Sequence, residues 1–87
     1  MYKLIVRKSV EKIFLKLIKK NPKQLEIIDK KIEEIRKNPQ HYKILKKPLQ
    51  HLKRVHIDKS FVVVFSVDES TKTVVIEDYD HHDKIYR

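Results

Sequence analysis

The chain has 87 residues, with 21 Lys and Arg against 12 Asp and Glu for a formal net charge of +9, and it contains no Cys and no Gly. At this length we expect a single domain, residues 1–87, with a small core. Without Cys there are no disulfides, no thiolate catalysis and no Cys-based zinc sites. Without Gly the phosphate-binding glycine loops are excluded, so we expect no nucleotide cofactor. The positive charge suits nucleic acid, an anionic membrane or an acidic protein partner.

We expect neither a membrane-spanning segment nor a signal peptide in this sequence. No run approaches the roughly 20 apolar residues that span a bilayer, and residues 1–7 lack the apolar region of a signal peptide. We therefore expect a cytoplasmic protein without a membrane partner. The many Lys, Glu and Ile residues, together with the lack of Cys and Gly, are typical of a thermophile.

The first half of the chain predicts one short strand and a helical hairpin. Residues 2–7 have strand character, and Ser9 is expected to cap a helix. One face of that helix is apolar at the spacing of the helical turn: Val10, Ile13, Phe14, Leu17 and Ile18. The pair Asn21-Pro22 ends it and starts a second helix, which closes at Asn38-Pro39. Its apolar stripe is Leu25, Ile28, Ile32 and Ile35.

The second half changes to a period of two and predicts three strands, at residues 52–57, 61–67 and 73–77. The second of these is apolar on both faces and belongs in the middle of a sheet. Short connections make an antiparallel meander. The predicted class is α+β, in the order β-α-α-β-β-β, with the helical hairpin packed on a small antiparallel sheet.

A basic segment precedes these strands. Residues 37–57 contain no acidic side chain, although acids are frequent elsewhere. Such cations can follow a phosphate backbone, bind an acidic partner, or simply form a solvated surface. The candidate RNA-binding residues are Lys43, Lys46, Lys47 and Lys53, with Arg87 at the C-terminus.

Proton carriers gather at the end of the chain and on the first strand of the meander. Arg54 and His56 share one strand face, opposite Val55 and Ile57. The last ten residues add His81, His82 and Tyr86. A single exposed His usually has no function, and Tyr86 is equally suited to packing at a sheet edge. The combination of imidazoles with cations favours a reaction site.

A metal site is not expected there. His81 and His82 are flanked by Asp78, Asp80 and Asp83, which are possible zinc or manganese ligands. Adjacent His residues on an extended segment point in opposite directions, so both seldom bind one ion.

RNA cleavage without a metal matches these residues better. The 2′-hydroxyl attacks the neighbouring phosphate, which requires a base, cations for the developing charge, and an acid for the 5′-oxygen. The catalytic candidates are Arg54, His56, His81, His82 and Tyr86, with base and acid unassigned. Tyr86 can be the base only if nearby cations stabilise its phenolate, since free Tyr has a pKa of about 10.

The order and spacing of these elements resemble the RelE and ParE toxin superfamily of toxin–antitoxin pairs over nearly the whole chain. The matching parts are the helical hairpin, the basic stretch before residues 52–57, the strand at 61–65 and the ending His81-His82-Asp83-Lys84-Ile85-Tyr86. The resemblance implies a ribosome-dependent mRNA endonuclease that inhibits translation. It also implies a RelB-like acidic antitoxin in a hetero-oligomer.

The chain departs from the family pattern at three positions. Val62 stands where Arg commonly follows the aromatic of the middle strand, His82 replaces the Arg of a His-Arg pair, and Lys47 replaces a Gly. Phosphate stabilisation then falls to Arg54, Lys53 or Arg87, and His82 is available for proton transfer. Two alternatives remain open: a ParE-like inhibitor of DNA gyrase without nuclease activity, and a non-catalytic nucleic-acid-binding module.

Overall fold

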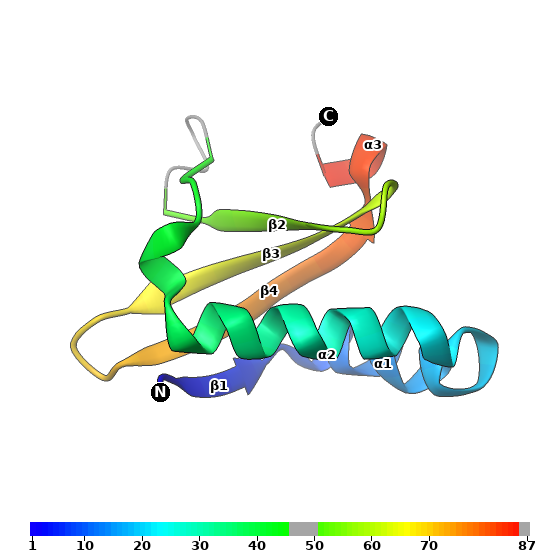
Figure 1. Cartoon of the computed structure of the whole chain (residues 1–87), viewed down its shortest axis with the longest axis horizontal. Coiled ribbons are helices and arrows are strands. Elements are labelled where there is room, and N and C mark those ends of the chain that lie inside the picture. Colours follow the sequence, from blue (N-terminus) through cyan, green and yellow to red (C-terminus); the bar gives the residue numbers. More distant parts are fainter. Residues whose placement is uncertain (46–50, 86–87) are drawn as a thin grey trace.

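The computed structural model describes residues 1–45 and 51–85. The elements follow in the order β1 (Lys3–Val6), α1 (Lys8–Lys20), α2 (Pro22–Lys37), the 3-10 helix η1 (Pro39–His41), β2 (Lys53–Ile57), β3 (Phe61–Asp68), β4 (Thr73–His81) and α3 (His82–Ile85). Figure 1 shows α1 and α2 side by side across one face of the sheet. This confirms the predicted α+β order and adds a short C-terminal helix.

The sheet is mixed. Its strand order is β1-β4-β3-β2, and β2, β3 and β4 form the antiparallel meander expected from their short connections. β1, however, pairs with β4 in parallel, so the expectation of a wholly antiparallel sheet is wrong for this edge. Nothing local in residues 2–7 fixes the direction of pairing, which depends on where the helical hairpin returns the chain.

Asn21 joins the two long helices. Its side-chain oxygen accepts a hydrogen bond of 3.2 Å from the backbone N–H of Gln24, and Pro22 occupies the first turn of α2. This is the arrangement expected of a cap followed by Pro. α1 begins earlier than predicted, because Arg7 takes the cap position and Ser9 lies inside the helix.

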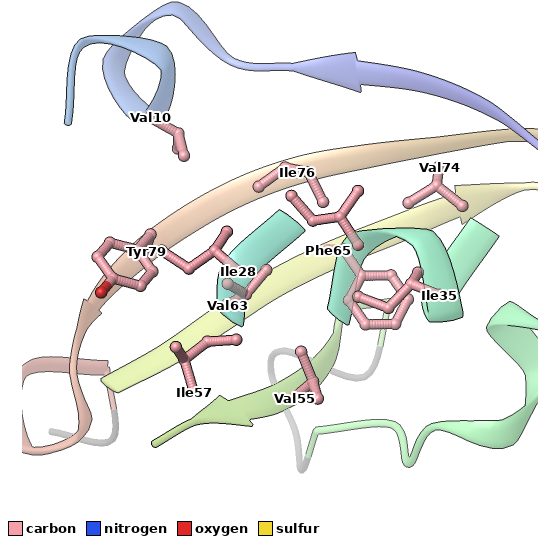
Figure 2. Close-up of a cluster of buried hydrophobic side chains, with 11 residues drawn as sticks. Val10, Ile28, Ile35, Val55, Ile57, Val63, Phe65, Val74, Ile76 and Tyr79 are labelled. Carbon is pink, nitrogen blue, oxygen red and sulfur yellow. The ribbon is translucent and has the colours of Figure 1, made fainter. Parts of the chain in front are cut away.

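The main core lies between the helical hairpin and the sheet. Ile28 and Ile35 of α2 pack above Phe65 and Ile76 of the central strands, and all four are fully buried (Figure 2). Ile18 does not belong to this core, since 53% of its surface is exposed. Of the five apolar residues predicted for the buried face of α1, Ile18 was therefore wrongly included.

A smaller cluster covers part of the opposite face, which we call the open face. Val62 and Val64 of β3 are buried there against Leu45, with Leu52 and Ile85 partly buried around them. The cluster seats α3 against the sheet and sets the position of the C-terminal imidazoles.

A one-residue bulge interrupts β4. Residues 78–81 pair with β3 in a register shifted by one relative to residues 73–76, and Glu77 is the extra residue. The strand thus continues four residues beyond the predicted end at 77. Apolar alternation breaks at the bulge, which is why the sequence pattern stops there.

Across the described part of the chain, every helix is too short or too polar to cross a membrane.

Candidate functional site

Arg54 and His56 lie together on the open face of β2. The intervening Val55 and the following Ile57 are buried under the helices, as the alternation predicts. A guanidinium nitrogen of Arg54 lies 3.4 Å from Nδ1 of His56. Arg is always a donor, so Nδ1 carries the lone pair in this contact. At this distance the contact is weak, and Arg54 can exchange it for a better acceptor.

α3 brings His82 to the same place. The imidazoles of His82 and His56 stack with centroids 5.6 Å apart and planes inclined by 27°. The backbone N–H of His82 donates a 2.7 Å hydrogen bond to the carbonyl of Ser60, which fixes the first residue of α3 beside the turn between β2 and β3. We call Arg54, His56 and His82 the open-face triad.

The surroundings lower the pKa of His56 below its ordinary value. The largest cause is partial burial of the ring, followed by the positive charge of Arg54 and then by His82. His56 as a residue is exposed, so this burial is only slight. Each influence disfavours the imidazolium, so His56 is predominantly neutral at pH 7.

Lys43 borders the triad. It lines a shallow concavity of about 230 Å³ together with Arg54 and His56, and His41, Tyr42 and Val55 complete the lining. Sequence reasoning missed His41 and Tyr42. In the sequence, these two residues are marked only by lying in the acid-free segment 37–57, which does not distinguish them from its other members.

His81 lies on the other side of the sheet. It pairs with Phe61, and the two rings meet edge to face at 5.6 Å. Phe61 in turn stacks on Tyr79, whose side chain belongs to the core under the helices. The ring of His81 therefore does not join the stack of His82 on His56, although both His residues were predicted to act together; the carboxylate of Asp83 lies within 3.7 Å of Nδ1 of each.

Lys53 also points away from the triad. Its ammonium donates hydrogen bonds of 3.1 Å to the carbonyl of Pro39 and 3.3 Å to the side chain of Gln40. It shares a strand face with Val55, so it holds η1 and does not extend the cationic surface of Arg54. Four candidate residues, Lys46, Lys47, Tyr86 and Arg87, lie outside the described residues.

Val62 occupies the position where the family pattern has Arg. It is fully buried in the small cluster and pairs with His56. Among the described residues, Arg54 and Lys43 line the concavity beside His56 and are the candidates for phosphate contacts, while Lys84 of α3 lies on the same face of the sheet.

No group of three or more acidic, His or Cys side chains within residues 1–45 and 51–85 is arranged to hold a metal ion. Asp83 lies 3.7 Å from Nδ1 of His81 and 3.6 Å from Nδ1 of His82, and it is highly exposed.

Solved structures of other proteins share this fold. A YoeB/ParE toxin from Agrobacterium tumefaciens superposes with a TM-score of 0.80 at 16% identity, over 92% of this chain and 98% of the other. The RelBE2 toxin–antitoxin complex of Mycobacterium tuberculosis contains a chain with a TM-score of 0.76 at 19% identity, over 93% and 98%. The fold is therefore that of the YoeB, ParE and RelE toxins.

Proteins that are similar in sequence show to which family the chain belongs. A protein of Methanocaldococcus jannaschii named "Putative toxin RelE4" is 56% identical over 87 residues, which cover all of this chain and 93% of that protein. An uncharacterised protein of Methanosarcina mazei is 62% identical over 86 residues, covering 99% of this chain and all of the other. No family model matches the sequence. The chain belongs to the RelE family, the toxins of toxin–antitoxin systems, and the predicted resemblance is confirmed.

Proposed function

We propose that this toxin is a ribosome-dependent endoribonuclease that cleaves mRNA at the open-face triad and so inhibits translation. The observation that carries the proposal is the stack of His82 on His56 beside Arg54, since a protein that only binds has no need to gather two proton carriers around a guanidinium. The family assignment supports it, because RelE and YoeB toxins are generally endoribonucleases.

The proposed reaction uses the 2′-hydroxyl next to the scissile phosphate. Neutral His56 takes its proton, the 2′-oxygen bonds to phosphorus, and the bond from phosphorus to the 5′-oxygen breaks. His82 or Tyr86 returns a proton to the leaving 5′-oxygen. The products are a 2′,3′-cyclic phosphate and a 5′-hydroxyl, so protons and bonds balance without a water molecule.

Arg54 has two successive roles in this scheme. In the free protein it contacts Nδ1 of His56 and helps to keep that ring neutral. When a phosphate enters, the guanidinium turns to the phosphate oxygens, where a bidentate contact is stronger. Nδ1 then has a free lone pair for the 2′-hydroxyl. Lys43, across the concavity, adds a second cation for the RNA backbone.

We further propose an acidic, RelB-like antitoxin as the partner that silences the toxin in a hetero-oligomer. The net charge of +9 supports a partner of opposite sign, and the fold is shared with toxins in the RelBE2 complex and in a YoeB–YefM complex of Staphylococcus aureus. Electrostatic attraction of this kind accelerates association and falls with salt. Ribosome and mRNA are the proposed targets once the antitoxin is removed.

The test compares the two adjacent His residues. The toxin, His82→Ala and the matched control His81→Ala are expressed without antitoxin, and mRNA integrity is followed by primer extension. We expect His82→Ala to abolish growth arrest and cleavage, and His81→Ala to retain both. Equal toxicity of all three with intact mRNA would contradict the nuclease assignment, and loss of DNA supercoiling would then favour gyrase inhibition.

Tyr86→Phe and Arg54→Ala extend the test. A catalytic Tyr86 predicts loss of cleavage in Tyr86→Phe without loss of ribosome binding. A plain nucleic-acid-binding module predicts instead that Tyr86→Phe and His82→Ala leave binding unchanged, whereas replacing Lys43, Lys46 or Lys47 by Ala weakens it.

A further inference from the structure

The bulge in β4 decides which His reaches the open face. In the observed register Val64 pairs with Asp78, whereas Phe65 pairs with Ile76, so Glu77 has no partner of its own. Side chains alternate between the two faces of a strand, and one extra residue exchanges the faces of everything that follows it.

The consequences of this exchange are visible on both faces. Beyond the bulge, Tyr79 enters the core under the helices, while Asp78 and Asp80 pair with Val64 and Val62 of the open face. His81 follows Tyr79 to the helix side and His82 continues on the open side, where it stacks on His56. An uninterrupted strand would place Asp78 in the core and send His81 to the open side.

Glu77 is held at the bulge by contacts from two other elements. The hydroxyl of Ser66 on β3 donates a 2.6 Å hydrogen bond to one carboxylate oxygen, and Nε of Arg7, between β1 and α1, donates 2.9 Å to the other. The backbone N–H of Arg7 also donates to the carbonyl of Ile76, directly before the bulge. The carboxylate thus links β3 to the residue that joins β1 to α1, on the two sides of β4.

Glu77 forms these contacts as an ionised carboxylate. Partial burial of Glu77 acts to raise its pKa, but the hydrogen bonds from Arg7 and Ser66 and the charge of Arg7 outweigh it, and the pKa lies below its usual value. A carboxylate accepts from both donors at once, which an apolar side chain cannot do.

We propose that Glu77 is a positioning residue: by bridging Ser66 and Arg7 it fixes the bulge of β4, and the bulge selects His82 instead of His81 as the imidazole that joins Arg54 and His56. The effect on cleavage rests on the proposed nuclease function, whereas the placement of the ring does not.

The titration of His56 reports on this placement without any assay of activity. Within residues 1–45 and 51–85, the charged and titratable groups near His56 are Arg54 on its own strand, His82 of α3, and His41 and Lys43, which line the same concavity. Asp83 lies 3.6 Å from Nδ1 of His82. Of the groups that shift the pKa of His56, His82 is the one that follows the bulge in the chain. If the bridge is lost and His82 moves away, the pKa of His56 rises toward its ordinary value.

The experiment follows the ring protons of His56 by NMR across pH in Glu77→Ala, Glu77→Gln and Ser66→Ala. We expect Glu77→Ala to raise the pKa of His56 by an amount comparable with His82→Ala and to remove the ring contact between His56 and His82. Glu77→Gln keeps one acceptor oxygen but places an amide N–H donor at the other position, so it can keep only one of the two contacts, and the rise should be intermediate. Direct loss of a negative charge would lower the pKa of His56, so the expected rise has the opposite sign to a simple electrostatic effect.

Glu69→Ala is the matched control. Glu69 is an exposed carboxylate at the turn between β3 and β4 that accepts hydrogen bonds from Tyr2 and Lys72 but lies outside the bulge. Glu69→Ala should leave the pKa of His56 unchanged. An unchanged pKa of His56 and an intact ring contact in folded Glu77→Ala would overturn the proposal.

If Glu77→Ala does not fold, Ser66→Ala decides the question, because it removes only one of the two bridging contacts. A raised pKa of His56 in Ser66→Ala supports the proposal, and a wild-type titration refutes it. Should the protein prove not to cleave RNA, the same titrations still answer whether Glu77 places His82.

Discussion

Tyr79→Phe tests the inward placement of β4 beyond the bulge. The Tyr79 hydroxyl accepts a 2.9 Å hydrogen bond from the side-chain amide of Gln24, and the two residues are only 4% and 6% exposed. Phe keeps the ring contacts with Phe14 and Phe61 but leaves the amide without its acceptor. An unsatisfied buried donor costs about 1–3 kcal/mol.

This cost converts to a large change in melting temperature. An unfolding entropy of about 2.1 cal/mol/K per residue gives about 0.18 kcal/mol/K for the 87-residue chain, so the Tm of Tyr79→Phe should fall by roughly 5–16 °C. Circular dichroism at 222 nm measures the transition. Burial raises the pKa of Tyr79, so the hydroxyl stays protonated throughout the usual pH range.

A double variant shows whether the lost stability of Tyr79→Phe comes from the unsatisfied amide of Gln24 or from a packing defect. Tyr79→Phe with Gln24→Met removes both polar partners, and most of the lost stability should return. Tyr42→Phe is the control, since that ring lies 5.6 Å from Phe65 and its hydroxyl forms no hydrogen bond with another described residue. A Tm for Tyr79→Phe no lower than the control, or purely additive losses in the double variant, would refute the reasoning.

Three further predictions concern the site. Because the pKa of His56 is lowered in the folded protein, the unfolded chain binds a proton at His56 more tightly than the folded one. The free energy of unfolding should therefore fall as the pH drops below about 6.5, the ordinary pKa of His. The urea midpoints at pH 7.5 and pH 5.5 should differ less in His56→Gln than in the wild type. Arg54→Ala should lower kcat/KM for ribosome-bound mRNA by about 10²- to 10³-fold, as loss of a donor to a developing oxyanion does, while the exposed Lys59→Ala should stay near wild type. A 2′-deoxy nucleotide at the scissile position should block cleavage, and Cd²⁺ should not rescue a phosphorothioate substrate; rescue would show that a metal contacts the phosphate.

Local patterns in the sequence were sufficient for most of the fold. The apolar run of β3 predicted a central strand. Of the stripe predicted for α2, Ile28, Ile32 and Ile35 are buried, whereas Leu25 is only partly buried. Both predictions depend on residues near in sequence whose burial is decided by periodicity alone. The parallel pairing of β1 was not predictable in this way, because it depends on the path of the whole chain.

The site was only partly predictable for the same reason. Alternation correctly placed Arg54 and His56 on one face of β2, and the side chain of Lys53 on the other face follows from the same rule. The grouping of His82 with them required a register and a helix that no local pattern specifies. α3 has four residues, too few for a helical periodicity to appear.

One trace of the bulge is nevertheless present in the sequence. The buried residues of β4 include Val74, Ile76 and Tyr79, so the spacing is two and then three. A strict period of two would bury Asp78, and an unpaired carboxylate in the core costs far more than a bulge. The chain therefore gains stability by inserting Glu77 as an extra residue. Before the bulge the odd-numbered residues of β4 lie on the open face, and after it the even-numbered residues do. In a strand that ends in two consecutive His residues, this spacing of three directs His81 to the helix side, and α3 then carries His82 to the open face.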